Sequence, residues 1–193
     1  MEQFKNKYRI ASARAPWWDY GNAGAYFITI CTRNREHFFG EINDGKMILS
    51  SIGVIADLLW HEIPNHANNV ELDAFVVMPN HIHGILILNG DDSGLDSGLD
   101  SGMDSRLVET GHALSLRDGQ NYHPRFRNPG KNTVSSIIGG YKSAVTKHAN
   151  RLGLKNRWQP RFYDHIIRDD AEYQRIKNYI SNNISNWKQD KFY

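Results

Sequence analysis

The chain has 193 residues, and 40% of them are apolar, which suits one compact domain over residues 1–193 with a buried core. A single cysteine excludes a disulfide framework. No apolar stretch reaches the roughly 20 residues that cross a bilayer, and the start lacks a secretory signal. We therefore expect a cytoplasmic protein without a membrane partner. The formal net charge of +2 averages an acidic stretch, 91–105, and a strongly basic one from Arg125 onward, so it does not exclude a nucleic-acid partner.

The first part of the chain predicts an arm and two strands. Residues 1–22 mix aromatic, basic and turn-forming residues without a period, which predicts an N-terminal arm. The run 25–32 is dense in β-branched and aromatic residues and follows a Gly-rich turn, so it predicts a buried strand. Residues 46–49 predict a second, short strand.

A helix is predicted over residues 51–63, whose apolar side chains recur at helical intervals. Ser50 or Ser51 is a suitable N-cap, and Pro64 would end the helix.

Two apolar runs, 71–78 and 82–88, are too short for core helices and are joined by Pro79-Asn80, so they predict neighbouring central strands. The stretch 91–105 then repeats Asp-Ser-Gly-Leu and has nothing to bury, which predicts a disordered, acidic low-complexity insertion. A calcium loop is the alternative for spaced aspartates, but the repeat lacks the ligand order and the closing Glu of such a site.

The C-terminal third predicts a helix, a strand and a last helix. Residues 133–152 carry apolar side chains at helical spacing, and residues 164–168 predict the strand. The last helix would begin at Asp169 or Asp170, where acidic residues suit the helix dipole. Its packed face would consist of Tyr173, Ile176, Ile180, Ile184 and Trp187.

This order of elements favours an α+β fold. A strand, a helix, two strands, a helix, a strand and a helix suit a single-domain sandwich, with a central antiparallel sheet and helices mainly on one face, as in ferredoxin-like folds.

Two histidines, His81 and His83, flank Ile82 at the start of a predicted strand. Side chains alternate between the faces of a strand, so both imidazoles would point the same way and Ile82 would point into the other layer. Two parallel imidazoles can chelate one divalent ion. The alternative is a hydrogen-bonded core histidine beside an exposed one, and the pair alone does not decide between them.

On the last predicted helix, Tyr179 and Asn183 lie one turn apart on the flank of the apolar face. A tyrosine in such a place is more often part of the core than a catalyst. Its meaning therefore depends on the rest of the sequence.

Three blocks follow one another along the chain: residues 75–84 (FVVMPNHIHG), residues 158–168 (WQPRFYDHIIR) and residues 173–183, which contain YISNN. Together they resemble the REP-associated tyrosine transposases, relatives of the single-tyrosine HUH transposases of small insertion sequences. The likeness runs from about Ala25 to Trp187. Three blocks in the right order are far more specific than any one of them.

The resemblance implies the same architecture, an HUH nuclease-like fold, and a catalytic or metal-binding role for several residues. In that family the His-hydrophobic-His motif supplies two metal ligands, which match His81 and His83, and a tyrosine of the last helix, matching Tyr179, is the nucleophile. A polar ligand one helical turn later makes Asn183 the candidate third ligand, where some relatives have glutamine. Two imidazoles and one amide oxygen would suit Mg²⁺ or Mn²⁺.

The reaction implied is cleavage of single-stranded DNA that leaves a 5′-phosphotyrosine link and a free 3′-hydroxyl, which a later attack would rejoin. The expected partner is single-stranded or hairpin DNA, bound on the nucleoid. Members of the family occur as monomers and as dimers, so the resemblance allows a homodimer.

DNA binding is assigned to basic side chains and nearby aromatic rings, although an ordinary solvated basic surface explains the charge equally well. The aromatic candidates include Phe162 and Tyr163, which could stack on exposed bases. The main candidates are Lys142, Lys147, Arg151, Arg161, Arg168 and Trp158.

Two other functions compete with a transposase-type nuclease. A binding-only regulator of the same fold would have lost cleavage, but it would need none of His81, His83 and Tyr179. A metal-dependent phosphohydrolase acting on nucleotides would use the two histidines without a tyrosine nucleophile.

Overall fold

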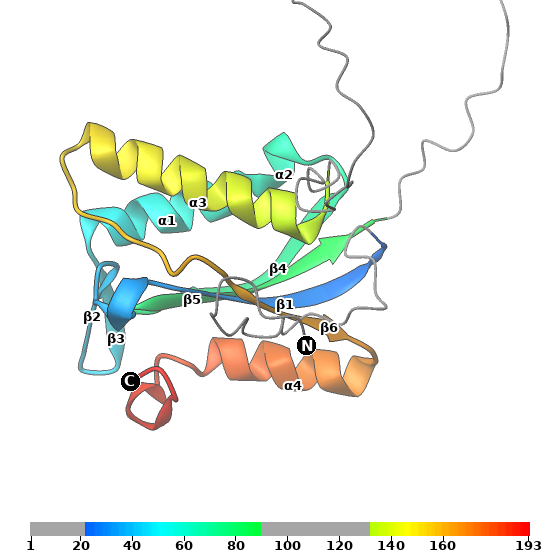
Figure 1. Cartoon of the computed structure of the whole chain (residues 1–193). Helices are drawn as coiled ribbons and strands as arrows, with labels where there is room; N and C mark the ends of the chain where they lie inside the picture. Colours follow the sequence, from blue (N-terminus) through cyan, green and yellow to red (C-terminus); the bar gives the residue numbers. More distant parts are fainter. Residues whose placement is uncertain (1–21, 90–131) are drawn as a thin grey trace, which may run out of the picture. The chain divides into compact units, whose positions relative to one another are not determined.

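The computed structural model describes residues 22–89 and 132–193. The acidic insertion 91–105 and all but the last residue of the predicted arm 1–22 lie outside the described residues (Figure 1). The described strands are β1 (Gly24–Cys31), β2 (Gly40–Asn43), β3 (Lys46–Leu49), β4 (Val70–Val77), β5 (His81–Leu88) and β6 (Tyr163–Ile167). The helices are α1 (Ser51–His61), α2 (Ile63–His66), α3 (Val134–Arg151) and α4 (Asp170–Ser181), with 3-10 turns η1 (Arg33–Arg35) and η3 (Trp187–Gln189).

Four strands form an antiparallel sheet in the order β4-β5-β1-β6. The predicted pairing of the two apolar runs is confirmed, but β4 is an edge strand, because its only neighbour in this sheet is β5. Strand β2, which the sequence did not predict, pairs with β3 in a separate hairpin. Asp44 and Gly45 have φ of 51° and 72°, which is the backbone of a two-residue turn that follows the strand twist.

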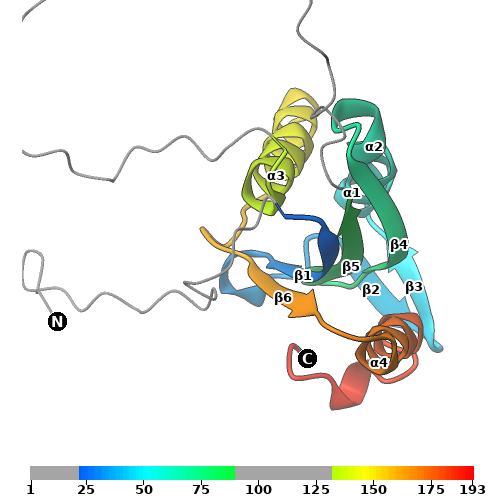
Figure 2. The same ribbon diagram turned by 90° about the vertical axis from the view of Figure 1, so that its right-hand side faces the viewer.

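Helices cover both faces of the sheet, with most of them on one face. Figures 1 and 2 show α1, α2 and α3 on one side and α4 alone on the other. This arrangement confirms the predicted α+β fold with a central antiparallel sheet and helices mainly on one face. None of the helices in the described ranges has the length and apolar character needed to span a bilayer.

The larger core lies between the sheet and the α1–α3 layer. Tyr26, Ile28, Ile82 and Leu86 are fully buried there, and the Trp60 ring stacks on Phe75 with centroids 4.7 Å apart. Burying such side chains contributes about 1.5–3 kcal/mol each.

Gly84 of β5 is required by this core. A Cβ at this position would overlap the Trp60 ring, so only glycine lets the indole lie directly on the strand. The close approach also explains why glycine follows the two histidines immediately.

Helix ends differ from the predicted ones in two places. Helix α1 has the predicted N-cap, because the Ser50 hydroxyl accepts from the Gly53 N–H at 3.1 Å. Pro64, however, lies in the first turn of α2, where its missing N–H costs nothing. Helix α4 ends at Ser181, so Ile184 and Trp187 lie beyond the helix, although both pack in a core cluster with Cys31 and Met78 as their apolar character predicts.

Helix α3 agrees with the predicted range and begins in a capping box. The Thr133 hydroxyl accepts from the Ser136 N–H, and the Ser136 hydroxyl accepts from the Thr133 N–H. His148 is exposed, whereas its neighbour Ala149 is buried, so the core stripe runs through Ala149.

Candidate active site

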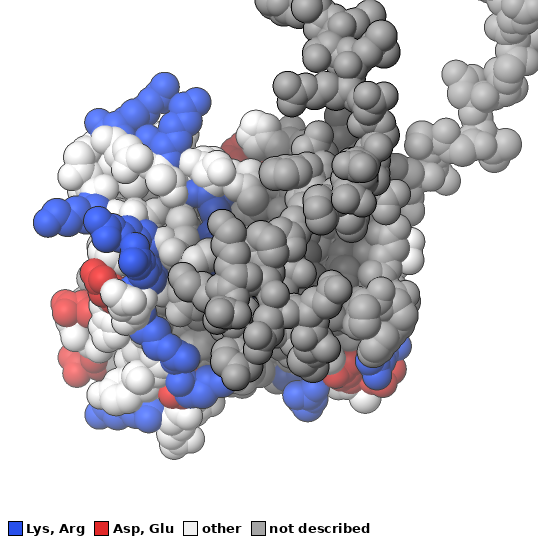
Figure 3. Space-filling view, viewed as in Figure 1, with Lys and Arg blue, Asp and Glu red and all other residues white. Residues whose placement is uncertain are grey.

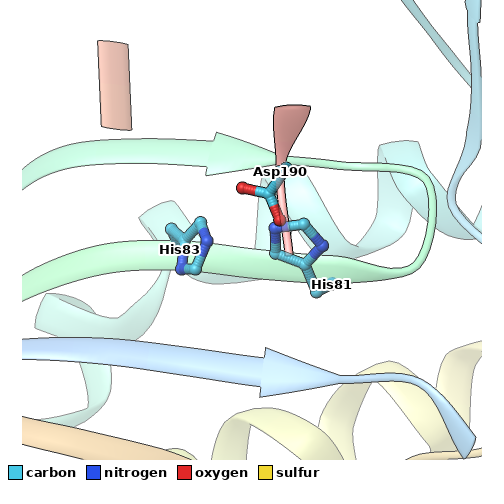
Figure 4. Close-up of side chains that lie close together, drawn as sticks. All are labelled: His81, His83 and Asp190. Atoms are coloured by element: carbon cyan, nitrogen blue, oxygen red, sulfur yellow. The ribbon is translucent and has the colours of Figure 1, made fainter. Parts of the chain in front are cut away.

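His81 and His83 lie on the α4 side of β5, and Ile82 lies in the opposite core, as the alternation of a strand predicts. Both imidazoles are fully buried, with ring centroids 4.5 Å apart. Figure 4 shows the two rings on the same side of the strand, facing the Asp190 carboxylate of the C-terminal segment.

A hydrogen bond at Nδ1 orients each imidazole. His81 Nδ1 lies 2.8 Å from Asn80 Oδ1, and His83 Nδ1 lies 2.9 Å from Thr29 Oγ1. Such contacts are typical of histidines whose other nitrogen binds a metal. His81 Nε2 is buried and has no hydrogen-bond partner.

Burial also keeps both histidines neutral. It lowers the pKa of His81 to about 3, with help from the positive charges of Arg35 and Lys191. Burial and the neighbouring His81 place the pKa of His83 well below its ordinary value. Neutral imidazoles are the form that binds a divalent ion.

Tyr179 of α4 places its hydroxyl against this pair. The Oη atom lies 3.2 Å from His83 Nε2 and donates to Asp190 Oδ2 at 2.8 Å. The side chain is 39% exposed, so it is not the core residue that its place beside the apolar stripe also suggested. Burial and the hydrogen bond to Asp190 raise the pKa of the phenol, which keeps it protonated at neutral pH.

Asp190 is a member of this cluster that the sequence did not predict. One carboxylate oxygen and one nitrogen each of His81 and His83 lie within 4.8 Å of one another. No repeat or spacing marks this aspartate, because it reaches the site only after the chain turns at the end of α4. Asn80 could have been noticed, since it directly precedes the motif.

Asn183 is buried beside Asp190. Its Nδ2 donates to Asp190 Oδ2 at 3.0 Å, whereas its Oδ1 is buried without a hydrogen-bond partner. A buried amide oxygen without a hydrogen-bond partner has lone pairs available to bind a donor or a metal ion.

A β-bulge in β4 anchors α4 to the sheet. The register shifts between Leu72 and Phe75, and this irregularity directs Asp73 toward α4. The Asp73 carboxylate accepts from the Tyr173 hydroxyl and from Lys177 Nζ at 2.9 Å. The ion pair therefore fixes α4 to the sheet at Lys177, about half a helical turn before Tyr179.

Known proteins resemble this chain in sequence and in fold. No family model matches the chain. An uncharacterized protein of Haemophilus influenzae is 34% identical over 183 residues, which cover 94% of this chain and 92% of that protein. The REP-associated tyrosine transposase of Escherichia coli is 24% identical over 164 residues, which cover 83% of this chain and 66% of that protein.

A solved structure with a similar fold is described as a REP-associated tyrosine transposase bound to a REP hairpin. Its TM-score is 0.56, at 20% sequence identity, and the match covers 94% of this chain and 77% of that one. The chain is thus similar to REP-associated tyrosine transposases in fold and, at 24% identity, in sequence.

The predicted DNA-binding residues divide into two groups. Lys142 Nζ donates to the Gln159 carbonyl at 2.6 Å, and Trp158 Nε1 donates to Thr146 Oγ1 at 3.1 Å. The Trp158 ring packs on the core, with its centroid 5.3 Å from that of Phe39. These two side chains support the fold locally, so Lys142 does not project freely from α3 in the way that a DNA-binding lysine would.

The other predicted basic residues, Lys147, Arg151, Arg161 and Arg168, are exposed. Figure 3 shows Lys and Arg side chains gathered on the left of the described surface, over the end of α3 and the segment that follows it. Exposed cationic side chains of this kind can contact a phosphate backbone.

Proposed function

We propose that the chain is a metal-dependent endonuclease and strand transferase for single-stranded DNA, with Tyr179 as its nucleophile. The observation that carries this proposal is the Tyr179 hydroxyl, 3.2 Å from His83 Nε2 and 2.8 Å from the Asp190 carboxylate. A regulator that only binds DNA would not need this cluster of buried, polar groups, which is costly to maintain.

The donor set fits a divalent ion, Mg²⁺ or Mn²⁺. The Nε2 atoms of His81 and His83 would hold it, together with the Asn183 amide oxygen or the Asp190 carboxylate as an oxygen ligand. The partnerless His81 Nε2 and Asn183 Oδ1 support this assignment. When bound, the ion would polarise the scissile phosphate.

Tyr179 would attack the scissile phosphorus through its phenolic oxygen. A bond forms between Oη and phosphorus, and the bond from phosphorus to the 3′-oxygen breaks. Asp190 would take the phenolic proton, because it already accepts the hydrogen bond from this hydroxyl. The departing 3′-oxygen takes a proton from water, and the hydroxide left behind accepts the proton that Asp190 took, which restores the carboxylate.

This step conserves the energy of the phosphodiester in a 5′-phosphotyrosine link. A second 3′-hydroxyl can attack that link and release Tyr179, which rejoins two strands without an outside energy source. We infer palindromic hairpin repeats as the DNA target, because the structurally similar transposase is described as bound to a REP hairpin.

The test is covalent adduct formation. The protein is incubated with labelled hairpin DNA carrying single-stranded flanks and with Mn²⁺ or Mg²⁺, and adducts are resolved on denaturing gels. We expect an adduct that Tyr179→Phe and a chelator both abolish. Tyr193→Phe is the matched control, since Tyr193 is a 69% exposed tyrosine in the segment that follows α4.

Two results would contradict the proposal. DNA that is bound and stays intact across a panel of hairpins would favour the binding-only regulator. Cleavage that persists in Tyr179→Phe would favour the phosphohydrolase that uses the two histidines alone.

A further inference from the structure

A cleft of about 430 Å³ extends from the catalytic cluster, since Tyr179, His83 and Asp190 form part of its lining. Tyr163 and Phe27 line it from the sheet, Arg175 and Tyr179 from α4, and Lys191 from the C-terminal segment. The volume lies within the range of about 300–1,000 Å³ that is common for small-ligand sites. It suits one splayed-out nucleotide and is too small for a duplex.

The cleft has a continuous aromatic wall. The Phe27 ring stacks on His83, with centroids 5.2 Å apart, and meets the edges of Tyr163 at 6.4 Å and Tyr179 at 6.2 Å. Tyr163 is 45% exposed, so much of its ring is open to solvent. An open aromatic ring next to a reaction centre is the usual platform for an unpaired base.

The sheet register aligns this platform with the histidines. Thr29 of β1 pairs with Tyr163 on one side and with His83 on the other, so the three residues form one row across three strands. Strands lie about 4.8 Å apart, which places Tyr163 roughly 10 Å from His83 at the backbone. A group bound at Tyr163 is therefore a close neighbour of the reacting phosphate.

The charges at the rim favour a phosphate. The Arg175 side chain is 71% exposed, and the Lys191 Nζ lies 5.9 Å from the centroid of the Tyr163 ring. The carboxylate of Glu172 also lines the cleft, but it already accepts from His165 at 2.9 Å and from the Arg168 N–H at 3.1 Å.

The second acidic group of the cleft, Asp190, is similarly engaged. Its carboxylate accepts from Tyr179, from Asn183 and from the Phe192 N–H. Both carboxylates are thus held by internal donors, and Glu172 also accepts from Arg175 at 3.3 Å. Arg175 and Lys191 are the two cationic side chains among the residues that line the cleft.

We propose that this cleft binds one nucleotide of single-stranded DNA that flanks the scissile phosphate, with the base on Tyr163 and a phosphate between Arg175 and Lys191. The proposal rests on the proposed function, since it locates the strand that Tyr179 would cleave. It assigns substrate binding to the α4 side of the sheet, apart from the exposed basic residues at the end of α3.

The test measures binding without cleavage. The full chain carrying Tyr179→Phe is titrated in EDTA with fluorescein-labelled dT8, and fluorescence anisotropy gives the affinity. We expect Tyr163→Ala in this background to weaken binding by on the order of tenfold, because stacking of one base on an aromatic ring has about this effect. Tyr163→Phe should keep the affinity, since it keeps the ring.

The phosphate contact has its own readout. Arg175→Gln should reduce the slope of log affinity against log salt by about 0.7, the value expected for one lost contact with a single-strand phosphate. Lys46→Gln is the matched control, because Lys46 is an exposed cation on β3 outside the cleft.

Equal affinity of Tyr163→Ala and its parent, or no measurable binding of dT8, would overturn the cleft assignment. A Tyr163-dependent affinity without any covalent adduct in the native chain would instead leave the cleft assignment standing and contradict the proposed nuclease. The two failures are therefore distinguishable.

Discussion

On one face of the sheet β5 contributes Ile82, Gly84 and Leu86 to an apolar core, and on the other it contributes His81 and His83 to a polar cluster. Both sets are buried to a similar degree. On the α1–α3 side, the residues that β5 contributes are apolar or lack a side chain, so they need no side-chain hydrogen bond. On the α4 side, burial leaves His81 Nε2 without a hydrogen-bond partner.

This difference separates stability from function within a single strand. Apolar side chains gain free energy from burial, whereas a buried polar atom without a partner costs about 1–3 kcal/mol. A destabilising buried polar atom is expected where that atom has a functional role. Alternate residues of β5 should therefore respond to different experiments.

The largest expected difference is in how variants of His81 and of its neighbour Ile82 respond to Mn²⁺. Native protein should gain about 2.7 kcal/mol of unfolding free energy at a Mn²⁺ concentration 100 times the dissociation constant. His81→Leu should lose this gain, because the metal site loses a ligand. Ile82→Val should cost about 0.5–1.5 kcal/mol and keep the whole gain. Chemical denaturation with Mn²⁺ and with EDTA measures both, and a Mn²⁺ gain retained by His81→Leu would remove His81 from the metal site.

Gly84 tests the apolar face alone. Gly84→Ala should destabilise the fold by about 1–3 kcal/mol, because the added methyl group overlaps the Trp60 ring. Gly139→Ala in α3 is the control: its Cβ meets nothing within 4 Å, and alanine should stabilise the helix by about 0.5–1 kcal/mol. Thermal unfolding compares them, and equal effects would show that the Trp60 contact is not tight.

Asp190 and Asn183 compete for the role of the third ligand. We expect Asp190→Asn to weaken Mn²⁺ binding by about tenfold, because a carboxylate is the stronger ligand for a hard cation. Asn183→Ala should weaken it less. Isothermal titration with Mn²⁺ alone decides between them, and the reverse order would assign the third position to Asn183.

The smallest effect concerns the contact that anchors α4. Hydrogen bonds from Tyr173 and Lys177 outweigh partial burial and lower the pKa of Asp73 below its ordinary value of 3.8. Its ionised form therefore stabilises the fold above pH 3.8, and the contribution is lost as the pH falls through the lowered value. For a contact at the surface, it should amount to less than about 1 kcal/mol.

Asp73→Asn should accordingly flatten the loss of stability between about pH 5 and pH 3, as urea unfolding at several pH values would measure. Asp57→Asn on α1, on the opposite face, is the control. A native-like acid profile in Asp73→Asn would show that the ion pair does not contribute to holding α4.

Local patterns explain most of what could be predicted. The strand β5, the capped helix α3 and the opposite directions of Ile82 and the two histidines follow from periods of 2 and 3.6 residues. The strand β2 was missed because four residues with one apolar side chain pointing inward carry little signal. The end of α4 was predicted too late because Ile184 and Trp187 continue the helical spacing after the helix has stopped.

The sequence by itself determined the order of strands and helices, the shared direction of His81 and His83, and the place of Tyr179 on the last helix, because each depends mainly on neighbours within a few residues. Only the tertiary structure decided that Asp190 joins this cluster and that Tyr163 lies in one row with His83. Tyr163 and Asp190 both lie far from the two histidines in the sequence, and these contacts depend on strand register and on the turn after α4, which no local pattern specifies.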